Sequence, residues 1–228
     1  MMRWLTMLCL LTSPATAEDW PCWRGPNRDG ISTEKDWLST WPKKGPKVAW
    51  KAKVELGFSS VVVSDGKLLT MGHRDGQDIV FCLNAKSGAK IWTFPFKSEK
   101  GAKYFEGGTC STPTIDGERA FVLSRWGDLF CLNLADGRKV WGKKLDMPLT
   151  TWGFAGSPVV HEKMLLLNVG ESGMALNKEN GKILWSSPKE EAGYSTPLPY
   201  RKDGEWRAIF SSGRGYSSVR LKDGKVLW

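Results

Sequence analysis

The chain has 228 residues, 41% hydrophobic and 25% charged, so it is long enough for a large β domain and is neither disordered nor collagen-like. Lysine and arginine number 33 against 24 acidic residues, a formal net charge of +9, and no stretch approaches the ~20 apolar residues of a membrane-spanning helix. The 13 tryptophans, 25 glycines and 12 prolines indicate a chain built from sheets and turns.

Residues 1–17 are typical of a secretory signal peptide. Arg3 provides a positive charge, Trp4–Leu11 is a short apolar run, and an A-x-A cleavage site ends at Ala17. The alternatives are a buried N-terminal helix or a lipid anchor at Cys9, but Leu8 stands where a lipid-attachment motif has a small residue. We therefore expect an exported, periplasmic or secreted protein, cleaved after Ala17, with an N-terminal extension over residues 18–47.

Four segments of twelve residues align without gaps and share glycine at the eighth position and tryptophan at the twelfth. The segments are Phe81–Trp92, Phe130–Trp141, Met174–Trp185 and Ser217–Trp228. The shared residues are Gly88, Gly137, Gly181 and Gly224, and Trp92, Trp141, Trp185 and Trp228. Trp50 keeps the same phase but lacks the preceding turn. A spacing of roughly 40–50 residues between short-strand units predicts a propeller repeat.

Each shared glycine lies in a predicted hairpin turn, and a further pair of β-rich runs precedes each hairpin. These pairs are Ser59–Ser64 with Lys67–Gly72, Cys110–Ile115 with Arg119–Ser124, Ser157–His161 with Lys163–Val169, and Ser195–Tyr200 with Trp206–Ser212. The sequence therefore predicts an all-β fold over residues 48–228: four β-propeller blades, each of four antiparallel strands.

Prolines lie in the first predicted strand of three blades, at Pro113, Pro158 and Pro197, which places these strands at the sheet edge facing the central channel. The repeated tryptophans fall in the outermost strand, where we expect their rings to wedge between blades. Four blades fall short of a seven- or eight-bladed ring, so we expect an open arc, with the strand of Trp50 unpaired or irregularly docked.

Cys82 and Cys131 occupy the same position of the repeat. Equivalent positions of neighbouring units usually lie beyond the ~4.4–6.8 Å Cα separation of a disulfide, so we predict buried free thiols there. The redox state of Cys22 and Cys110 stays open, since export would permit oxidation. His73 and His161 have no partner at metal-site spacing, which disfavours a zinc site.

The twelve-residue block resembles the tryptophan-docking repeat of quinoprotein dehydrogenases, A-x-D-x-x-x-G-x-x-x-W. Glycine and tryptophan match in all four units, while the aspartate is replaced by Asn84, Asn133, Asn177 and Arg220. The opening segment Asp19–Ser32 is similar to the start of exported bacterial propellers of the pyrroloquinoline-quinone-like (PQQ-like) family. The resemblance implies a propeller fold, which by itself hosts many functions.

We interpret the chain as an exported, non-catalytic binding or scaffold module of the cell envelope, in the manner of the outer-membrane-protein assembly lipoprotein of the same superfamily. Its expected partner is an envelope protein or a small ligand, and we assign no catalytic residue, metal ligand or cofactor.

One alternative is a PQQ- and Ca²⁺-dependent alcohol or sugar dehydrogenase. The resemblance would then imply oxygen ligands for Ca²⁺, a general-base aspartate and a disulfide between adjacent cysteines. The sequence has no adjacent cysteine pair. Glu106 and Glu171 fall in predicted loops, where solvated carboxylates are the simpler interpretation.

A second alternative is an envelope glycan-binding module, because aromatic side chains at loop ends can stack on sugar rings. The repeat does not explain Tyr104, Phe105, Trp126, Trp152, Phe154 and Tyr216. Caps over the core between blades would account for them equally.

The positive charge does not favour nucleic-acid binding. The lysines scatter through predicted turns and outer strands, which is typical of a solvated face. The lysines concerned include Lys43, Lys44, Lys90, Lys139, Lys182 and Lys225. The run Lys97–Lys103 is predicted to be an inter-blade loop.

Overall fold

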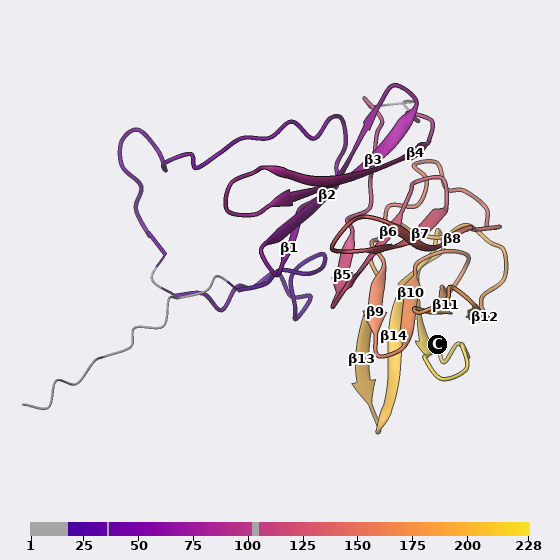
Figure 1. Cartoon of the computed structure of the whole chain (residues 1–228). Coiled ribbons are helices and arrows are strands. Elements are labelled where there is room, and N and C mark those ends of the chain that lie inside the picture. The colour runs from indigo at the N-terminus through magenta and orange to yellow at the C-terminus, as the bar shows by residue number, and fades with distance from the viewer. Residues whose placement is uncertain (1–17, 36, 102–104) are drawn as a thin grey trace, which may run out of the picture.

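The computed structural model describes residues 18–35, 37–101 and 105–228, so the predicted signal peptide and Tyr104 lie outside it. All regular secondary structure in these residues is β, in fifteen strands (Figure 1). None of the described segments forms a helix long and apolar enough to cross a membrane. The prediction of an all-β fold is confirmed.

The strands form four antiparallel meanders that follow one another along the chain (Figure 1). The first blade contains β1 (Val62–Ser64), β2 (Lys67–Arg74), β3 (Gln77–Asn84) and β4 (Lys90–Lys97). The second contains β5 (Thr114–Asp116), β6 (Arg119–Leu123), β7 (Asp128–Asn133) and β8 (Lys139–Lys144). The third contains β9 (Val159–His161), β10 (Met164–Leu167), β11 (Met174–Asn177) and β12 (Ile183–Ser186). The fourth contains β13 (Leu198–Lys202), β14 (Glu205–Ser211) and β15 (Tyr216–Arg220). The described residues therefore form part of a β-propeller.

The fourth blade departs from the prediction of four strands. Its expected outer strand makes one isolated bridge, between Val219 and Val226, and three backbone hydrogen bonds. These bonds run from Ser218 to the Trp228 carbonyl, from Arg220 to the Lys225 carbonyl and from Leu227 to the Ser218 carbonyl. This pairing is too short to form a regular strand, and the Trp228 side chain is 63% exposed.

The predicted boundaries of the inner strands were also wrong. The strands β5, β9 and β13 each begin one residue after Pro113, Pro158 and Pro197, because proline has no N–H to donate to a sheet. The segment of Trp50 forms no regular strand, and its continuation makes isolated bridges from Leu56 to His73 and from Gly57 to Thr109.

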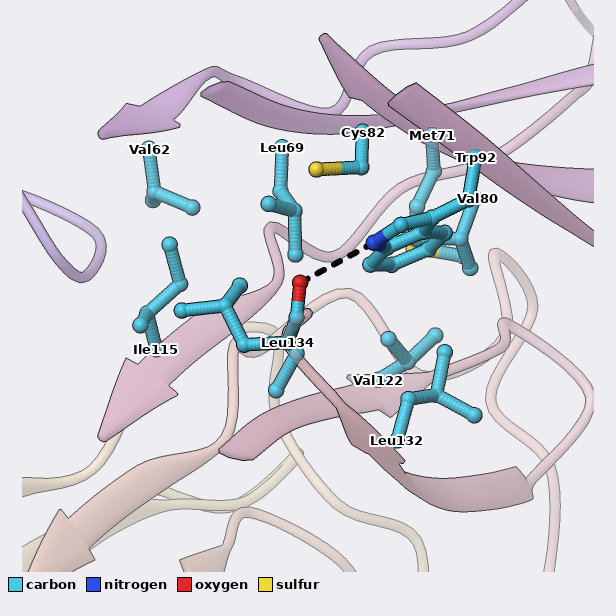
Figure 2. Close-up of a cluster of buried hydrophobic side chains, with 11 residues drawn as sticks. Val62, Leu69, Met71, Val80, Cys82, Trp92, Ile115, Val122, Leu132 and Leu134 are labelled. Atoms are coloured by element: carbon cyan, nitrogen blue, oxygen red, sulfur yellow. Dashed lines mark hydrogen bonds between the residues drawn. The ribbon is translucent and has the colours of Figure 1, made fainter. Parts of the chain in front are cut away.

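Each repeated tryptophan except Trp228 packs on the turn of the following repeat. The Trp92 ring covers Gly137. Its Nε1 donates a hydrogen bond to the Leu134 carbonyl at 3.0 Å (Figure 2). The same pair of contacts joins Trp50 to Gly88 and Ala85, Trp141 to Gly181 and Lys178, and Trp185 to Gly224 and Leu221. The four glycines have φ between +70° and +74°, a conformation that glycine adopts without steric cost.

Apolar side chains fill the space between consecutive blades. Between the first and second blades, Leu69, Cys82 and Trp92 pack against Ile115 and Val122 (Figure 2). Similar clusters lie between the second and third blades and between the third and fourth. Blade-to-blade packing therefore supplies most of the buried apolar surface that stabilises the fold.

A second set of contacts joins the blades along their inner strands. The backbone N–H of Ser60 donates to Thr112 Oγ1, that of Thr112 to Ser157 Oγ, and that of Ser157 to Thr196 Oγ1, each at 3.0 Å. The three acceptors directly precede Pro113, Pro158 and Pro197. We call these three bonds the hydroxyl latch.

The N-terminal extension crosses the inner strands of three blades, and we call residues 19–30 the strap. Trp20 exchanges two backbone hydrogen bonds with Val63 of β1. The Pro21 carbonyl accepts from the N–H of Ile115 in β5, and Arg28 Nη2 donates to the Val160 carbonyl of β9 at 2.8 Å. The strap therefore lies against the inner strands, and together they form the wall of the space between them.

Candidate functional site

A cavity of about 410 Å³ lies between the strap and the inner edges of the blades. The strap contributes Trp23, Arg24 and Arg28. The segments leading into the inner strands contribute Phe58, Cys110, Thr112, Ala155, Ser157 and residues 194–198. The volume is within the ~300–1,000 Å³ of typical ligand sites.

The three residues of the hydroxyl latch line this cavity. Thr112, Ser157 and Thr196 each accept a backbone N–H through the hydroxyl oxygen, and all three residues line the cavity. Among the described residues, none of these three hydroxyls donates its own proton to an acceptor. Each therefore retains a donor for a bound group.

Two guanidinium groups contribute the positive charge of the cavity. Arg24 Nη2 donates to the Asp29 carbonyl, and Arg28 Nη2 to the Val160 carbonyl, both at 2.8 Å. Within the described part of the chain, neither arginine forms an ion pair, and the buried Nε of Arg28 has no hydrogen-bond partner. Both side chains therefore keep unused donors.

Aromatic rings line the same space and its rim. Trp23, Phe58 and Tyr194 line the cavity. Phe105 packs edge-on against both Phe58 and Trp152, with ring centroids 5.4 Å apart in each pair. We call Phe58, Phe105 and Trp152 the rim cluster.

Arg125 contacts two residues of the rim cluster, Phe105 and Trp152. Its side chain is 2% exposed, stacks on Phe105 and Trp126, and donates to the Trp152 carbonyl at 2.8 Å. The other aromatics singled out from the sequence lie elsewhere. Phe154 is buried in the core, Trp126 donates to the Glu99 carbonyl, and Tyr216 is exposed on the fourth blade.

All four cysteines in the described residues are free, as predicted for Cys82 and Cys131. Burial raises the pKa of both of these thiols to about 11. Burial also raises the pKa of Cys110, which lines the cavity, so this thiol stays protonated near neutral pH and is a weak nucleophile.

The structure does not assemble the carboxylates considered for a calcium site. Glu106 is exposed, and Glu171 lies 3.9 Å from Arg214. No group of three or more His, Cys, Asp or Glu side chains placed to hold a metal occurs in residues 18–35, 37–101 and 105–228.

The two histidines have separate surroundings. His73 Nδ1 lies 2.8 Å from buried Asp78, whose other oxygen accepts from Ser98 Oγ at 2.8 Å. His161 packs edge-on against Trp206, with ring centroids 4.3 Å apart. Neither residue lines the cavity between the strap and the inner strands.

A family model described as outer membrane protein assembly factor BamB, PQQ_2, matches residues 76–228, two thirds of the sequence. The chain belongs to the PQQ_2 family. No curated protein matches it. Solved structures with similar PQQ_2-like blades include BamB from Moraxella catarrhalis, at 19% identity and a TM-score of 0.56 over 81% of this chain and 56% of that one.

Two dehydrogenases are also similar in fold. Quinohemoprotein alcohol dehydrogenase from Comamonas testosteroni is 14% identical, with a TM-score of 0.57 over 76% of this chain and 34% of that one. A europium-containing methanol dehydrogenase is 13% identical, with a TM-score of 0.58 over 80% and 43%. This PQQ_2 chain thus spans roughly a third to just over half of the length of these structures, and the likeness establishes the fold.

Sequence reasoning missed the strap and its two arginines as part of a site. The signal was present in the run WPCWRGPNRDG within the extension, which is rich in turn residues, arginine and tryptophan. Sequence reasoning assigns that run to an N-terminal extension and to a family resemblance, because nothing local indicates that it crosses three inner strands, one of them 132 residues away.

Proposed function

We propose that this chain is part of an exported, non-catalytic binding module of the bacterial cell envelope, and that the cavity beside the strap is its binding site. Residues 1–17 would be removed on export, residues 18–47 would be the extension, and residues 48–228 would be blades of a larger ring.

The composition of the cavity wall is the observation that carries the proposal. The wall combines hydroxyl donors, guanidinium groups and aromatic rings, which recognise ligands by hydrogen bonds, charge and stacking. Cys110 in the same wall is held protonated by burial, which makes it a poor covalent catalyst.

The anchoring of the wall also supports a binding role. The hydroxyl latch fixes Thr112, Ser157 and Thr196 relative to one another across three blades. The strap is tied to the first and second blades by backbone hydrogen bonds, and to the third by the bond from the Arg28 side chain to the Val160 carbonyl. A site held in this way loses little conformational entropy when a partner binds.

Site-specific photo-crosslinking in living cells tests the proposal. A photoreactive phenylalanine analogue replaces Tyr194 at the cavity, and in a control protein it replaces Val140, which is exposed on the outer strand β8. We expect a defined covalent adduct from position 194 and none from position 140. Adducts from position 140 alone, or from neither position, would argue against the cavity.

The dehydrogenase alternative has its own test. The purified protein is incubated with PQQ, Ca²⁺, an electron-acceptor dye and a panel of alcohols and sugars. We expect no dye reduction above that of the mixture without protein. Substrate-dependent reduction of the dye would replace the binding proposal with an enzymatic one.

The rim cluster favours glycan binding as a second candidate function. Phe58 is 58% exposed, lines the cavity and packs against Phe105 of the rim cluster. Binding of envelope oligosaccharides on a glycan array, lost in Phe58→Ala, would support this candidate. Unchanged array binding in Phe58→Ala would exclude the rim cluster as the site.

A further inference from the structure

The arginines of the strap lack the carboxylate partners that arginines normally find. Fourteen ion pairs join Lys or Arg to Asp or Glu among the described residues, and neither Arg24 nor Arg28 takes part in any of them. The Asp29 carboxylate beside Arg24 is engaged by the backbone N–H of Ile31 at 2.9 Å. The Asp19 carboxylate is engaged by Ser64 Oγ at 2.7 Å and by the Asp65 N–H.

Arg28, unlike Arg24, has a buried nitrogen without a hydrogen-bond partner. Its Nη2 bonds to the Val160 carbonyl, while its Nε is buried and has no partner. A buried donor without an acceptor destabilises the folded state, so such a group calls for an explanation. Arg28 Nη1 forms no hydrogen bond among the described residues and is not among the buried atoms, so this nitrogen is the one that could donate to an oxyanion in the adjoining cavity.

The rest of the wall favours the same class of ligand. No Asp or Glu lines the cavity. The hydroxyls of Thr112, Ser157 and Thr196 each accept one backbone N–H, and each still has its own proton to donate to an acceptor. A cavity wall that carries two guanidinium groups and hydroxyl donors, and no carboxylate, favours an anionic ligand.

The apolar part of the wall indicates what the anion is attached to. Trp23, Phe58 and Tyr194 line the cavity beside the arginines. A ligand with a charged oxygen pair at one end and an apolar or aromatic body at the other would satisfy both parts of the wall.

We propose that the cavity binds a carboxylate group joined to an apolar body, with Arg24 and Arg28 as its charge partners. This inference rests on the proposed binding function. The carboxylate belongs either to a small organic acid or to the carboxyl terminus of a polypeptide, and both present the same pair of oxygens to an arginine.

Calorimetric titration with matched probes tests the proposal. The first pair is N-acetylphenylalanine and its amide. The second pair is an N-acetylated hexapeptide ending in phenylalanine, with a free or an amidated carboxyl terminus. Each acid should bind at least about tenfold more tightly than its amide, which corresponds to about 1.4 kcal/mol. Equal affinities of acid and amide in both pairs would overturn the proposal.

The two pairs also distinguish the sources of the carboxylate. Tighter binding of the hexapeptide acid than of N-acetylphenylalanine identifies a polypeptide terminus. Equal affinities of the two acids identify a small organic acid. Both results support a carboxylate site.

Arginine substitutions locate the site. Arg24→Gln and Arg28→Gln should each weaken binding of the acids at least about tenfold and leave the amides unaffected. Arg201→Gln, at an exposed arginine of β13 outside the cavity, is the matched control and should bind as the wild type does. If Arg28→Gln unfolds through loss of its bond to Val160, exposed Arg24 decides the question. Wild-type affinity in Arg24→Gln and in any folded Arg28→Gln would refute the proposal.

Failure of this proposal differs from failure of the binding function. Crosslinking from position 194 without discrimination between acid and amide would retain a binding site and exclude carboxylate recognition. Absence of crosslinking together with absence of acid binding would remove both.

Discussion

The indole ring of Trp92 lies so close to Gly137 that a Cβ added to the glycine would be 2.6 Å from Cε3 of the ring. The two residues belong to consecutive blades, and the same relationship links Trp50, Trp141 and Trp185 to the glycine of the following repeat. The repeat therefore specifies both halves of a contact, with the tryptophan on one blade and its docking surface on the next.

Gly137→Ala should destabilise the protein more than Gly66→Ala. Both glycines have positive φ, at +74° and +67°, so both substitutions should incur the ~1–2 kcal/mol cost of a left-handed alanine. Only Gly137 has a ring in contact, and displacing that ring should add about 1–3 kcal/mol. Denaturant unfolding of the two variants measures the difference. Equal destabilisation would mean that the Trp92 contact contributes nothing.

Replacing the docked tryptophans should destabilise the protein according to their burial. Trp92→Ala, at a side chain 8% exposed, should cost about 3–5 kcal/mol. Trp141→Ala should cost less, because Trp141 is only half-buried. Trp37→Ala, at a tryptophan 74% exposed, is the control and should have little effect. Thermal and denaturant unfolding give the ranking, and an unchanged stability of Trp92→Ala would contradict the docking role.

Ser157→Ala should weaken the hydroxyl latch. The substitution leaves the buried N–H of Thr112 without its acceptor, at a cost of about 1–3 kcal/mol. Ser157→Thr keeps a hydroxyl and should restore most of the stability, while Ser186→Ala on the exposed outer strand should have little effect. Amide hydrogen exchange at Thr112 reports the bond directly. Unaltered protection of that amide in Ser157→Ala would exclude the latch.

His161 should make the protein less stable in mild acid. Burial, with a contribution from Arg28, lowers the pKa of His161 below its usual 6.5, against the opposing effect of Glu162. The folded state therefore favours the neutral ring, and its contribution to stability, complete above pH 6.5, is lost as pH falls toward the lowered pKa. Free energies of unfolding at about pH 7.5 and about pH 5 should differ more in the wild type than in His161→Gln. The same pH dependence in both proteins would show that His161 is not the group responsible.

The cysteines should react in an order set by their burial. Cys82 and Cys131 are fully buried with pKa values of about 11, so a thiol reagent should leave both unmodified in the folded protein at about pH 8. Cys110 is partly exposed at the cavity and should react first, and more slowly when N-acetylphenylalanine is bound. Peptide mapping by mass spectrometry identifies the modified residue. Early modification of Cys82 or Cys131 would contradict the packing between blades.

The sequence predicted the parts of the fold that depend on local chemistry. Asp65-Gly66 and Asp203-Gly204 each form a two-residue turn with positive φ at both positions, as the residue types require. The twelve-residue repeat likewise identified the hairpins that carry Gly88, Gly137 and Gly181.

The candidate site could not be predicted in the same way, because its residues are brought together only by the arrangement of the blades. Arg28 and Val160 are 132 residues apart in the sequence. Thr112 and Ser157 occupy equivalent positions in their repeats, each directly before a proline. Whether they form a hydrogen bond depends on the distance between the two inner strands, which the sequence does not contain. The arginines Arg24 and Arg28 have no counterpart in the repeat, so no periodic pattern marked them.

The structure of the complex captured by crosslinking from position 194 tests whether the cavity is the binding site. We expect the partner or ligand to occupy the space between the strap and the inner strands, within hydrogen-bond distance of Ser157 or Thr196 and close to Arg28. A bound molecule found only on the outer strands β4, β8 and β12, with the cavity unchanged, would contradict it.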